Sequence, residues 1–319
     1  MRIIRLTEPY DQTQIPNSDV VLAMGFFDGV HRGHQRVINV ARKKAHNTHL
    51  PLAVLTFDIY PKIFFTDVTK DTMRYLTLNQ EKIERMEALG VDILYIVTFD
   101  ENLAYMLPQE FIDKYAVALR ARYLVAGADF TYGPPAIATM PLLPEYAQGR
   151  FNIMCVNHLC DGDQKVSSTR IRQALAAGQM TEANRLLGYH YQVHGKVVHG
   201  FQRGRELGFP TLNVLPWAQE RIPGDGVYAV RVRLDGESTW YQGMASIGNN
   251  ETFGSDLART VEINLFNFNR QVYGRKVTVE WAYYLRPMVK FNGIVELIAQ
   301  LKADRTKSRQ VLATRKQDS

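Results

Sequence analysis

Between residues 20 and 127, short apolar runs alternate with segments of helical periodicity, and this alternation constrains the fold more than any other feature. The runs occupy residues 20–25, 52–57, 92–99 and 123–127. They are apolar almost throughout, as is typical of strands that are buried on both faces. From Asn79, and again from Pro108, apolar residues recur at helical spacing, and Gly90 offers a stop for the first of these helices. Strands that alternate with helices predict a parallel sheet.

After about residue 190 the periodicity changes. Runs rich in β-branched and aromatic residues follow one another and are separated by Gly, Pro or Asn turns. Consecutive strands of this kind predict an antiparallel sheet, which we expect to close into a barrel. Four apolar residues on one face then predict a final helix. They are Ile294, Leu297, Ile298 and Leu301. We expect two domains, residues 1–187 and 188–319, and a chain of 319 residues is long enough for two cores.

Composition argues against several classes of protein. No apolar run approaches the roughly 18 residues of a membrane-spanning helix, and the N-terminus lacks the apolar stretch of a signal peptide, so we expect a cytoplasmic protein with no membrane partner. The net charge is +6, but residues 302–319 hold six basic and two acidic residues, which is +4 of that excess. A basic groove for nucleic acid is therefore not required. Cys155 and Cys160 flank His158, yet this segment lacks four metal ligands, so we expect ordinary thiols.

The sequence GFFDGVHRGH, residues 25–34, directly follows the first predicted strand and precedes a helical pattern. His31 and His34 would then lie in the first turn of a helix, where free backbone N–H groups and the helix dipole favour an anion. Three glycines would let the backbone approach a phosphate closely. They are Gly25, Gly29 and Gly33. By itself such a short pattern favours a turn with surface caps, but the strand before it and the helix after it reverse this preference and favour a phosphate site.

A second segment, VSSTRIRQALAAG at residues 166–178, also predicts the start of a helix. Ser167 or Ser168 can cap the helix, while Arg170 and Arg172 project from its first turns. An ordinary capped helix with solvated arginines would produce the same pattern. The segment gains weight only in combination with the histidine pair.

Together the two segments resemble the FAD synthetases, the flavin-type members of the nucleotidyltransferases. GFFDGVHRGH resembles their HxGH signature, and VSSTRIR resembles their SSTxIR segment. The resemblance implies a Rossmann-like N-terminal domain in which ATP binds between the two helix starts, with magnesium assisting. The phosphate of FMN would attack the α-phosphorus, giving FAD and pyrophosphate. It implies catalytic roles for His31 and His34. The implied ATP-binding residues are Gly25, Phe27, Asp28, Gly33, Ser167, Ser168, Thr169 and Arg172.

A third segment, GADFTYG at residues 127–133, resembles the family's flavin-side DFxFG loop. This implies that Asp129 and Phe130 bind the flavin. Here the sequence also departs from the family pattern. Ala136 and Ala138 follow the loop where glycines are common, Ile59 and Tyr60 replace a proline and a histidine, and Phe26 replaces an asparagine. The ATP half of the site is intact, and we expect altered affinity or rate in the flavin half.

The sequence GKVVHGFQRGRELGFPTLN, residues 195–213, is the most specific stretch of the chain. Its glycines suit backbone amides that wrap a phosphate chain. Thr211 and Asn213 lie two residues apart, and they offer oxygen ligands of the kind that magnesium prefers. Without further context, a glycine-rich turn with Thr and Asn hydrogen bonds would explain so loose a pattern.

The whole stretch resembles the riboflavin kinase signature GxVxxGxxxGxxLGFPTxN, with Leu212 in place of an alanine. The likeness continues through PGDGVYAV, ASIGNNETF, TVEINLFNF and LRPMVKF. It implies that the barrel transfers phosphate from ATP to riboflavin, with Glu262 as general base. By periodicity alone Glu262 would face solvent, because it alternates with apolar neighbours. Asn264 and Asn267 stand where a histidine and an aspartate are common. The implied ligands are Gly200, Gly204, Gly208 and Pro210 for ATP, and Thr211 and Asn213 for Mg²⁺.

The sequence therefore predicts a bifunctional enzyme that converts riboflavin to FMN and FMN to FAD, with ATP as co-substrate. One alternative is a riboflavin kinase whose N-terminal domain has altered or lost activity. Another is a regulator that binds flavin or RNA, although a regulator need not keep His31, His34, Thr211, Asn213 and Glu262. The expected partners are small molecules, without nucleic acid or membrane. The sequence does not predict an oligomeric state.

Overall fold

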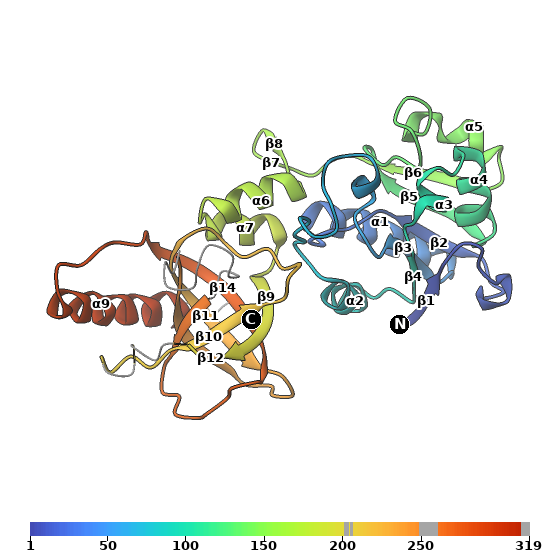
Figure 1. The fold of residues 1–319 in the computed structure, drawn as a ribbon. Coiled ribbons are helices and arrows are strands. Elements are labelled where there is room, and N and C mark those ends of the chain that lie inside the picture. The colour runs from blue at the N-terminus through green and yellow to red at the C-terminus, as the bar shows by residue number, and fades with distance from the viewer. Residues whose placement is uncertain (201–203, 205–206, 249–260, 314–319) are drawn as a thin grey trace. The chain divides into compact units, whose positions relative to one another are not determined.

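The computed structural model describes residues 1–200, 204, 207–248 and 261–313. Parts of two motifs, 201–203 with 205–206 and 249–253, lie outside the described residues. The chain forms two compact units, Met1–Ser167 and Ser168–Ser319 (Figure 1). In the described part of the chain, no helix is long and apolar enough to cross a membrane.

The first unit contains a six-stranded sheet in the order β1-β4-β3-β2-β5-β6, and all its strand pairs are parallel. Its strands are β1 (Arg2–Leu6), β2 (Val20–Met24), β3 (Leu52–Phe57), β4 (Ile93–Val97), β5 (Ala121–Gly127) and β6 (Asn152–Val156). The four central strands and the parallel sheet confirm the sequence prediction. The two edge strands, β1 and β6, were not predicted because partly exposed side chains interrupt their apolar pattern.

Helices cover both faces of this sheet. They are α1 (Arg32–Thr48), α2 (Asn79–Ala88), α3 (Glu101–Ala104), α4 (Pro108–Ile112) and α5 (Leu143–Ala147). Short 3₁₀ segments span Gln12–Gln14, Pro61–Phe64 and Met140–Leu142, and a π-helical turn spans Asp113–Val117. Alternate residues of β2 enter two separate cores. Leu22 packs with Phe111 in one core, whereas Val21 packs with Ile38 and Met86 in the other.

The carboxyl ends of β3, β2 and β5 are neighbours, because β2 pairs with β3 on one side and with β5 on the other. The chain passes from β2 to β3 through α1, and it later adds β5 on the opposite side of β2. Ligands of open parallel sheets bind at such a reversal of strand order. The first phosphate motif follows β2, and the flavin-side loop follows β5, so both lie at this edge.

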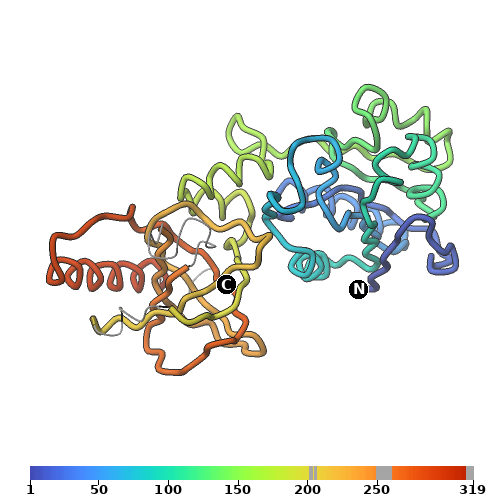
Figure 2. Tube along the Cα trace, in the orientation of Figure 1, coloured from blue at the N-terminus to red at the C-terminus, as the bar shows by residue number. Residues whose placement is uncertain are grey.

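The second unit is a closed antiparallel barrel with strand order β10-β13-β12-β11-β14-β9. Its strands are β9 (Tyr191–Val198), β10 (Leu212–Pro216), β11 (Gly226–Leu234), β12 (Trp240–Ile247), β13 (Val261–Leu265) and β14 (Lys276–Arg286). This confirms the predicted barrel and the α/β plus β fold class. Two helices, α6 (Ser168–Ala176) and α7 (Met180–Leu187), precede the barrel in the same unit (Figure 2). The Asn184 amide on α7 donates to the carbonyls of Trp281 at 2.9 Å and Ala282 at 3.2 Å on β14.

The terminal helix α9 (Ile294–Ala313) confirms the predicted final helix, and Ile298 and Leu301 of the predicted apolar face pack against a core of Phe209, Met244 and Phe266. Ile294 is 62% exposed, and the buried side chains of this helix are Asp304, Ser308 and Leu312. Asp304 is buried because Arg286 on β14 donates to its carboxylate at 2.8 Å and 3.0 Å. A buried charge is tolerated when it is paired, and hydrophobic periodicity does not detect such a pair.

Candidate active sites

Two histidines meet at the start of α1. His31 is the N-cap residue, and its Nδ1 accepts a hydrogen bond from the backbone N–H of His34 at 3.3 Å. The two rings stack with centroids 3.5 Å apart. The prediction that both lie in the first helical turn was wrong for His31, which precedes the helix and satisfies one of its free N–H groups.

The imidazole ring of His34 is neutral, and one of its nitrogens makes no hydrogen bond with the described residues. Burial, the neighbouring His31 and the ammonium groups of Lys82 and Lys165 hold the pKa of His34 well below its ordinary value. The ring is therefore uncharged at pH 7. Its Nδ1 atom is buried and has no hydrogen-bond partner among the described residues. A buried polar atom without a partner is rare and is typical of a ligand site.

The predicted glycines next to the histidines make room for aromatic rings. A Cβ on Gly25 would lie 2.8 Å from the ring of Phe27, and a Cβ on Gly33 would lie 3.0 Å from the ring of His31. Phe27 itself has a φ of 55° and packs edge-on against His34 with ring centroids 5.3 Å apart. These glycines thus allow the packing that holds the histidine pair. Their close approach to a phosphate stays a prediction.

Asp28 anchors the loop after β2. Its carboxylate is 2% exposed and accepts hydrogen bonds from the backbone N–H groups of Leu76 at 3.0 Å and Thr77 at 3.3 Å. The hydroxyl of Thr77 in turn accepts from the N–H of Gly29 at 3.0 Å. The loop that carries the histidines is therefore tied to the segment before α2, and direct phosphate binding by Asp28 stays a prediction.

Asp129 follows β5 and belongs to a charged cluster with the hairpin formed by β7 (Cys160–Asp161) and β8 (Gln164–Lys165). Its carboxylate accepts from the Lys165 ammonium at 2.5 Å and lies 3.7 Å from Nδ1 of His158. Partial burial opposes ionisation, but Lys165 and His158 hold the pKa of Asp129 below its ordinary value. Phe130, beside it, is partly buried against the core. Flavin binding by these two residues stays a prediction.

Two of the departures from the family pattern contact one another. The rings of Phe26 and Tyr60 have centroids 5.2 Å apart, and Tyr75 lies 6.2 Å from Phe26. The hydroxyl of Tyr75 accepts from the N–H of Tyr60 at 3.2 Å. Ala138, a third departure, is buried in the core, whereas Ala136 is exposed. Sequence reasoning treated Phe26 and Tyr60 as separate differences, whereas they form one aromatic cluster.

Residues of the SSTRIR segment occupy the beginning of α6. Ser168 begins the helix, and the guanidinium of Arg170 donates to the carboxylate of Glu182 on α7. Arg170 is thus part of an internal ion pair. The predicted association of Ser167, Ser168, Thr169 and Arg172 with ATP stays a prediction.

In the second unit, Gly200 and Gly204 of the kinase motif stand where a Cβ atom would collide with neighbouring atoms, whereas Gly208 has open space around it. A Cβ on Gly200 would lie 2.0 Å from the amide nitrogen of Asn213, and a Cβ on Gly204 would lie 2.3 Å from the carbonyl oxygen of Phe209. Gly208 has a φ of 75°, a conformation that favours glycine. The Asn213 side chain therefore lies directly against the Gly200 backbone.

Glu262 belongs to a polar row that crosses three barrel strands. On β13 it pairs with Asn213 on β10 and with Ser246 on β12, and residues paired across strands project from the same face. Asn264 follows two residues later on that face, and its amide donates to the carbonyl of Pro210 at 2.8 Å. Asn213 and Asn264 are buried, and Glu262 is half-buried. The register thus brings together the predicted general base and one predicted metal ligand.

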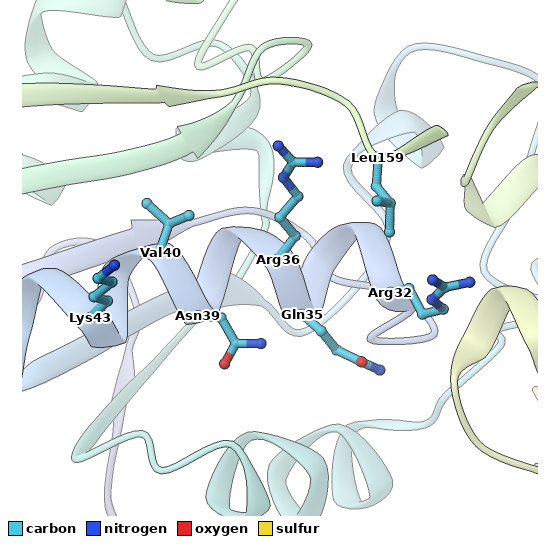
Figure 3. Close-up of a pocket in the computed structure, with 7 residues that line it drawn as sticks. All are labelled: Arg32, Gln35, Arg36, Asn39, Val40, Lys43 and Leu159. Carbon is cyan, nitrogen blue, oxygen red and sulfur yellow. The ribbon is translucent and has the colours of Figure 1, made fainter. Parts of the chain in front are cut away.

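A shallow pocket of about 460 Å³ runs along one flank of α1 (Figure 3). Arg36 and Val40 extend to one side of the helix in this view, and Gln35 and Asn39 to the other. Arg32, one of the lining residues, lies 4.0 Å from the carboxylate of Asp161. The full lining is Arg32, Gln35, Arg36, Asn39, Val40, Lys43 and Leu159. Sequence reasoning did not select this surface, since it treated α1 only as the helix that follows the histidines.

The two cysteines are free and exposed, Cys155 on β6 and Cys160 on β7. Over the residues that the structure describes, no group of three His, Cys, Asp or Glu side chains could hold a metal ion.

Comparisons with known proteins identify the two units. Residues 13–170 match the FAD synthetase family, and residues 187–312 match the riboflavin kinase family. A bifunctional riboflavin kinase/FMN adenylyltransferase of Listeria monocytogenes is 43% identical over 98% of this chain and 99% of that protein. The protein of the same name in Bacillus subtilis is 40% identical over 96% of both chains.

A solved structure also matches nearly the whole chain. It is named a macrolide-efflux protein from Streptococcus pneumoniae and is 37% identical, with a TM-score of 0.88 over 97% of this chain and 99% of that chain. The likeness shows that the fold of both units is shared. Two family models cover most of the chain and the relatives align over nearly its whole length, so the chain belongs to the bifunctional riboflavin kinase/FMN adenylyltransferase family.

Proposed function

We propose that this enzyme makes FMN from riboflavin and ATP in the barrel, and FAD from FMN and ATP in the parallel-sheet domain. The observation that carries the proposal is that each described unit assembles its own polar centre. These centres are the stacked His31 and His34 at the start of α1, and the row of Asn213, Glu262, Ser246 and Asn264 in the barrel. We divide the two activities at residues 1–187 and 188–319.

In the kinase reaction, Glu262 acts as general base. It accepts the proton of the ribityl hydroxyl as that oxygen attacks the γ-phosphorus of ATP, and ADP leaves. Gly200, Gly204, Gly208 and Pro210 shape the backbone around the phosphate chain. The buried side chain of Asn213 is suited to bind Mg²⁺, because it offers an amide oxygen and lies opposite Glu262 on the neighbouring strand. Thr211, the second ligand, directly precedes the same strand. When bound, Mg²⁺ would neutralise charge on the transferred phosphate.

In the adenylylation reaction, an oxygen of the FMN phosphate attacks the α-phosphorus of ATP. The bond from that phosphorus to the bridging oxygen of the β-phosphate breaks, and pyrophosphate leaves. His31 and His34 stabilise the phosphates, because a neutral ring and free helix N–H groups can donate to oxygens on which negative charge develops. Ser167, Ser168, Thr169 and Arg172 bind ATP, and Asp129 and Phe130 bind the flavin. We place the enzyme in the cytoplasm, with small molecules rather than nucleic acid or membranes as its partners.

The test is incubation of the full chain with riboflavin, ATP and magnesium, followed by chromatography of the flavins. FMN should appear first and FAD later, and supplied FMN should give FAD without riboflavin. FMN without any FAD would support the alternative, a riboflavin kinase whose N-terminal domain has altered or lost activity. If neither FMN nor FAD were formed, the proposal would be contradicted.

The magnesium site is tested by Thr211→Ala combined with Asn213→Ala. We expect the apparent magnesium affinity of FMN formation to fall about 10- to 100-fold, the range seen when groups that support a metal site are lost. High magnesium should partly rescue the rate. The measurement is a magnesium titration of FMN formation, and an unchanged midpoint would remove both residues from the metal site.

A smaller change should act on the same amide. In Gly200→Ala the new methyl group would overlap the Asn213 side chain, which must rotate away. We expect the magnesium midpoint of the kinase to rise while FMN adenylylation is unchanged. Gly293→Ala is the control, because a Cβ there meets nothing within 4 Å. A variant with normal magnesium dependence would show that Asn213 need not hold its observed position.

A further inference from the structure

Lys82 on α2 is a buried cation beside the adenylylation site. Its side chain is only 3% exposed. Its Nζ atom lies 3.3 Å from the carbonyl oxygen of Phe57 and 3.5 Å from the hydroxyl of Thr56, both at the carboxyl end of β3. The same atom lies 4.4 Å from the centroid of the Phe26 ring, which follows β2. One ammonium thus contacts the ends of two neighbouring strands.

The hydrogen bonds of this ammonium go to neutral oxygens, whereas its charged neighbours act through space. Asp28 from the loop after β2 and Asp58 from the end of β3 favour the charged form of Lys82. The charge of Lys82 in turn helps to lower the pKa of His34 on α1. Burial outweighs the two carboxylates and lowers the pKa of Lys82 to about 8. At pH 7 the group is therefore charged in surroundings that disfavour a charge. Such a residue reduces stability, which is typical of a functional position.

A chain of contacts leads from Lys82 to the histidine pair. The hydroxyl of Thr56, next to Nζ, donates to the backbone carbonyl of Phe26 at 2.8 Å. The next residue, Phe27, has a left-handed backbone and packs edge-on against the ring of His34. A shift of Phe26 relative to β3 would therefore move the aromatic ring that holds His34.

We infer that Lys82 is a positioning residue for adenylyl transfer. Its ammonium group contacts Phe26 in the loop after β2 and Phe57 at the end of β3, and in this way it holds the histidine pair in position. The inference rests on the proposed adenylylation activity. It concerns a residue that the sequence motifs do not include, and it assigns the aromatic face of Phe26 the role of stabilising this ammonium through a cation–π interaction.

The first test is Lys82→Met in the full chain, with FMN and ATP supplied. We expect kcat for FAD formation to fall about 100-fold, since a displacement of about 1 Å at a reacting group has that effect. KM for ATP should change little, and FMN formation from riboflavin should be unchanged. Lys82→Arg should retain more activity because it keeps the charge. Lys70→Met, an exposed lysine exchanged in the same way, is the control.

The pH profile separates positioning by a charge from simple packing. Lys82 loses its proton as pH rises through about 8, so FAD formation by the unmodified enzyme should decline above that pH. Lys82→Met should lack this decline. Phe26→Leu should move it to lower pH, because the ring face that stabilises the cation is gone. The charged and titratable groups that face Lys82 are Asp28, Asp58 and His34, and the pKa of His34 is held well below its ordinary value, so the His34 ring should not titrate near pH 8.

Thermal unfolding gives a third readout. The pKa of Lys82 is lower in the folded than in the unfolded chain, so the unfolded state binds more protons between about pH 8 and 10.5. The cost of burying the charge is therefore present below pH 8 and disappears as pH rises to 10.5. Lys82→Met should unfold at a higher temperature than the unmodified protein below pH 8, and this gain should shrink above it.

A variant that is more stable but slower, without the alkaline decline, would establish the inference. A Lys82→Met variant with unchanged FAD formation would overturn it, and so would a slower variant that is less stable and keeps the decline. If the unmodified enzyme made no FAD from FMN, the proposed adenylylation itself would fail, which is a distinct result.

Discussion

Glu262→Gln should abolish FMN formation while conversion of supplied FMN to FAD continues at the unmodified rate. A positioned general base contributes about 10²–10⁴ to the rate, and the amide of glutamine cannot accept the proton of the ribityl hydroxyl. The substitution keeps the size of the side chain, and Glu262 is only half-buried, so folding should be preserved. The measurement is the single-turnover rate of FMN formation, alongside FAD formation from FMN in the same preparation.

The matched control for this variant is Glu280→Gln, the same exchange on the barrel strand β14. Glu280 pairs with Arg231 at 2.9 Å and lies outside the polar row, so the kinase rate should stay near its original value. If both activities fell together in a folded Glu262→Gln protein, the division of labour between the two domains would be wrong. A kinase rate within a few-fold of the original would remove Glu262 from the role of base.

His31→Ala and His34→Ala should each slow adenylylation about 10²- to 10³-fold, equivalent to about 2.7–4 kcal/mol of transition-state stabilisation. Loss of one preorganised donor has this effect because the interaction strengthens as charge develops on the departing pyrophosphate. The enzyme should then convert riboflavin to FMN and accumulate it. Flavin chromatography over time measures both steps in one reaction.

The two histidines should also differ in stability. Removal of His31 takes away the N-cap acceptor of α1, which typically costs about 0.5–2 kcal/mol, whereas His34 accepts no such bond. His46→Ala, at the exposed far end of the same helix, controls for the loss of an imidazole. Folded variants at both positions that made FAD at the unmodified rate would require the nucleotidyltransferase assignment of residues 1–187 to be abandoned.

Local patterns were sufficient to predict much of this molecule. The central strands β2, β3, β4 and β5 are continuous apolar runs because neighbours cover both of their faces, so each run can be recognised without knowledge of its partners. The change to consecutive strands after residue 190 predicted the barrel, because strands that follow one another without helices between them form antiparallel sheets. The histidine pair and the glycine-rich kinase segment are short motifs whose residues are close in sequence, and both could be located directly.

Long-range contacts decided the rest. The edge strands β1 and β6 have half-exposed patterns, and α9 buries Asp304 because Arg286 on a distant strand neutralises it. Nothing local distinguishes Lys82 from the surface lysines of an amphipathic helix, since its burial depends on Phe26, Thr56 and Phe57 from two other segments.

The sequence by itself determined which residue types and elements the protein has, because helical and strand periodicity and short motifs are properties of neighbouring residues. Only the tertiary structure decided which of these residues meet. The pairing of Asn213 with Glu262 depends on the register of two strands whose paired residues are 49 positions apart in the sequence. Such a register is set by the closure of the whole barrel, in which each strand must satisfy the hydrogen bonds of both neighbours.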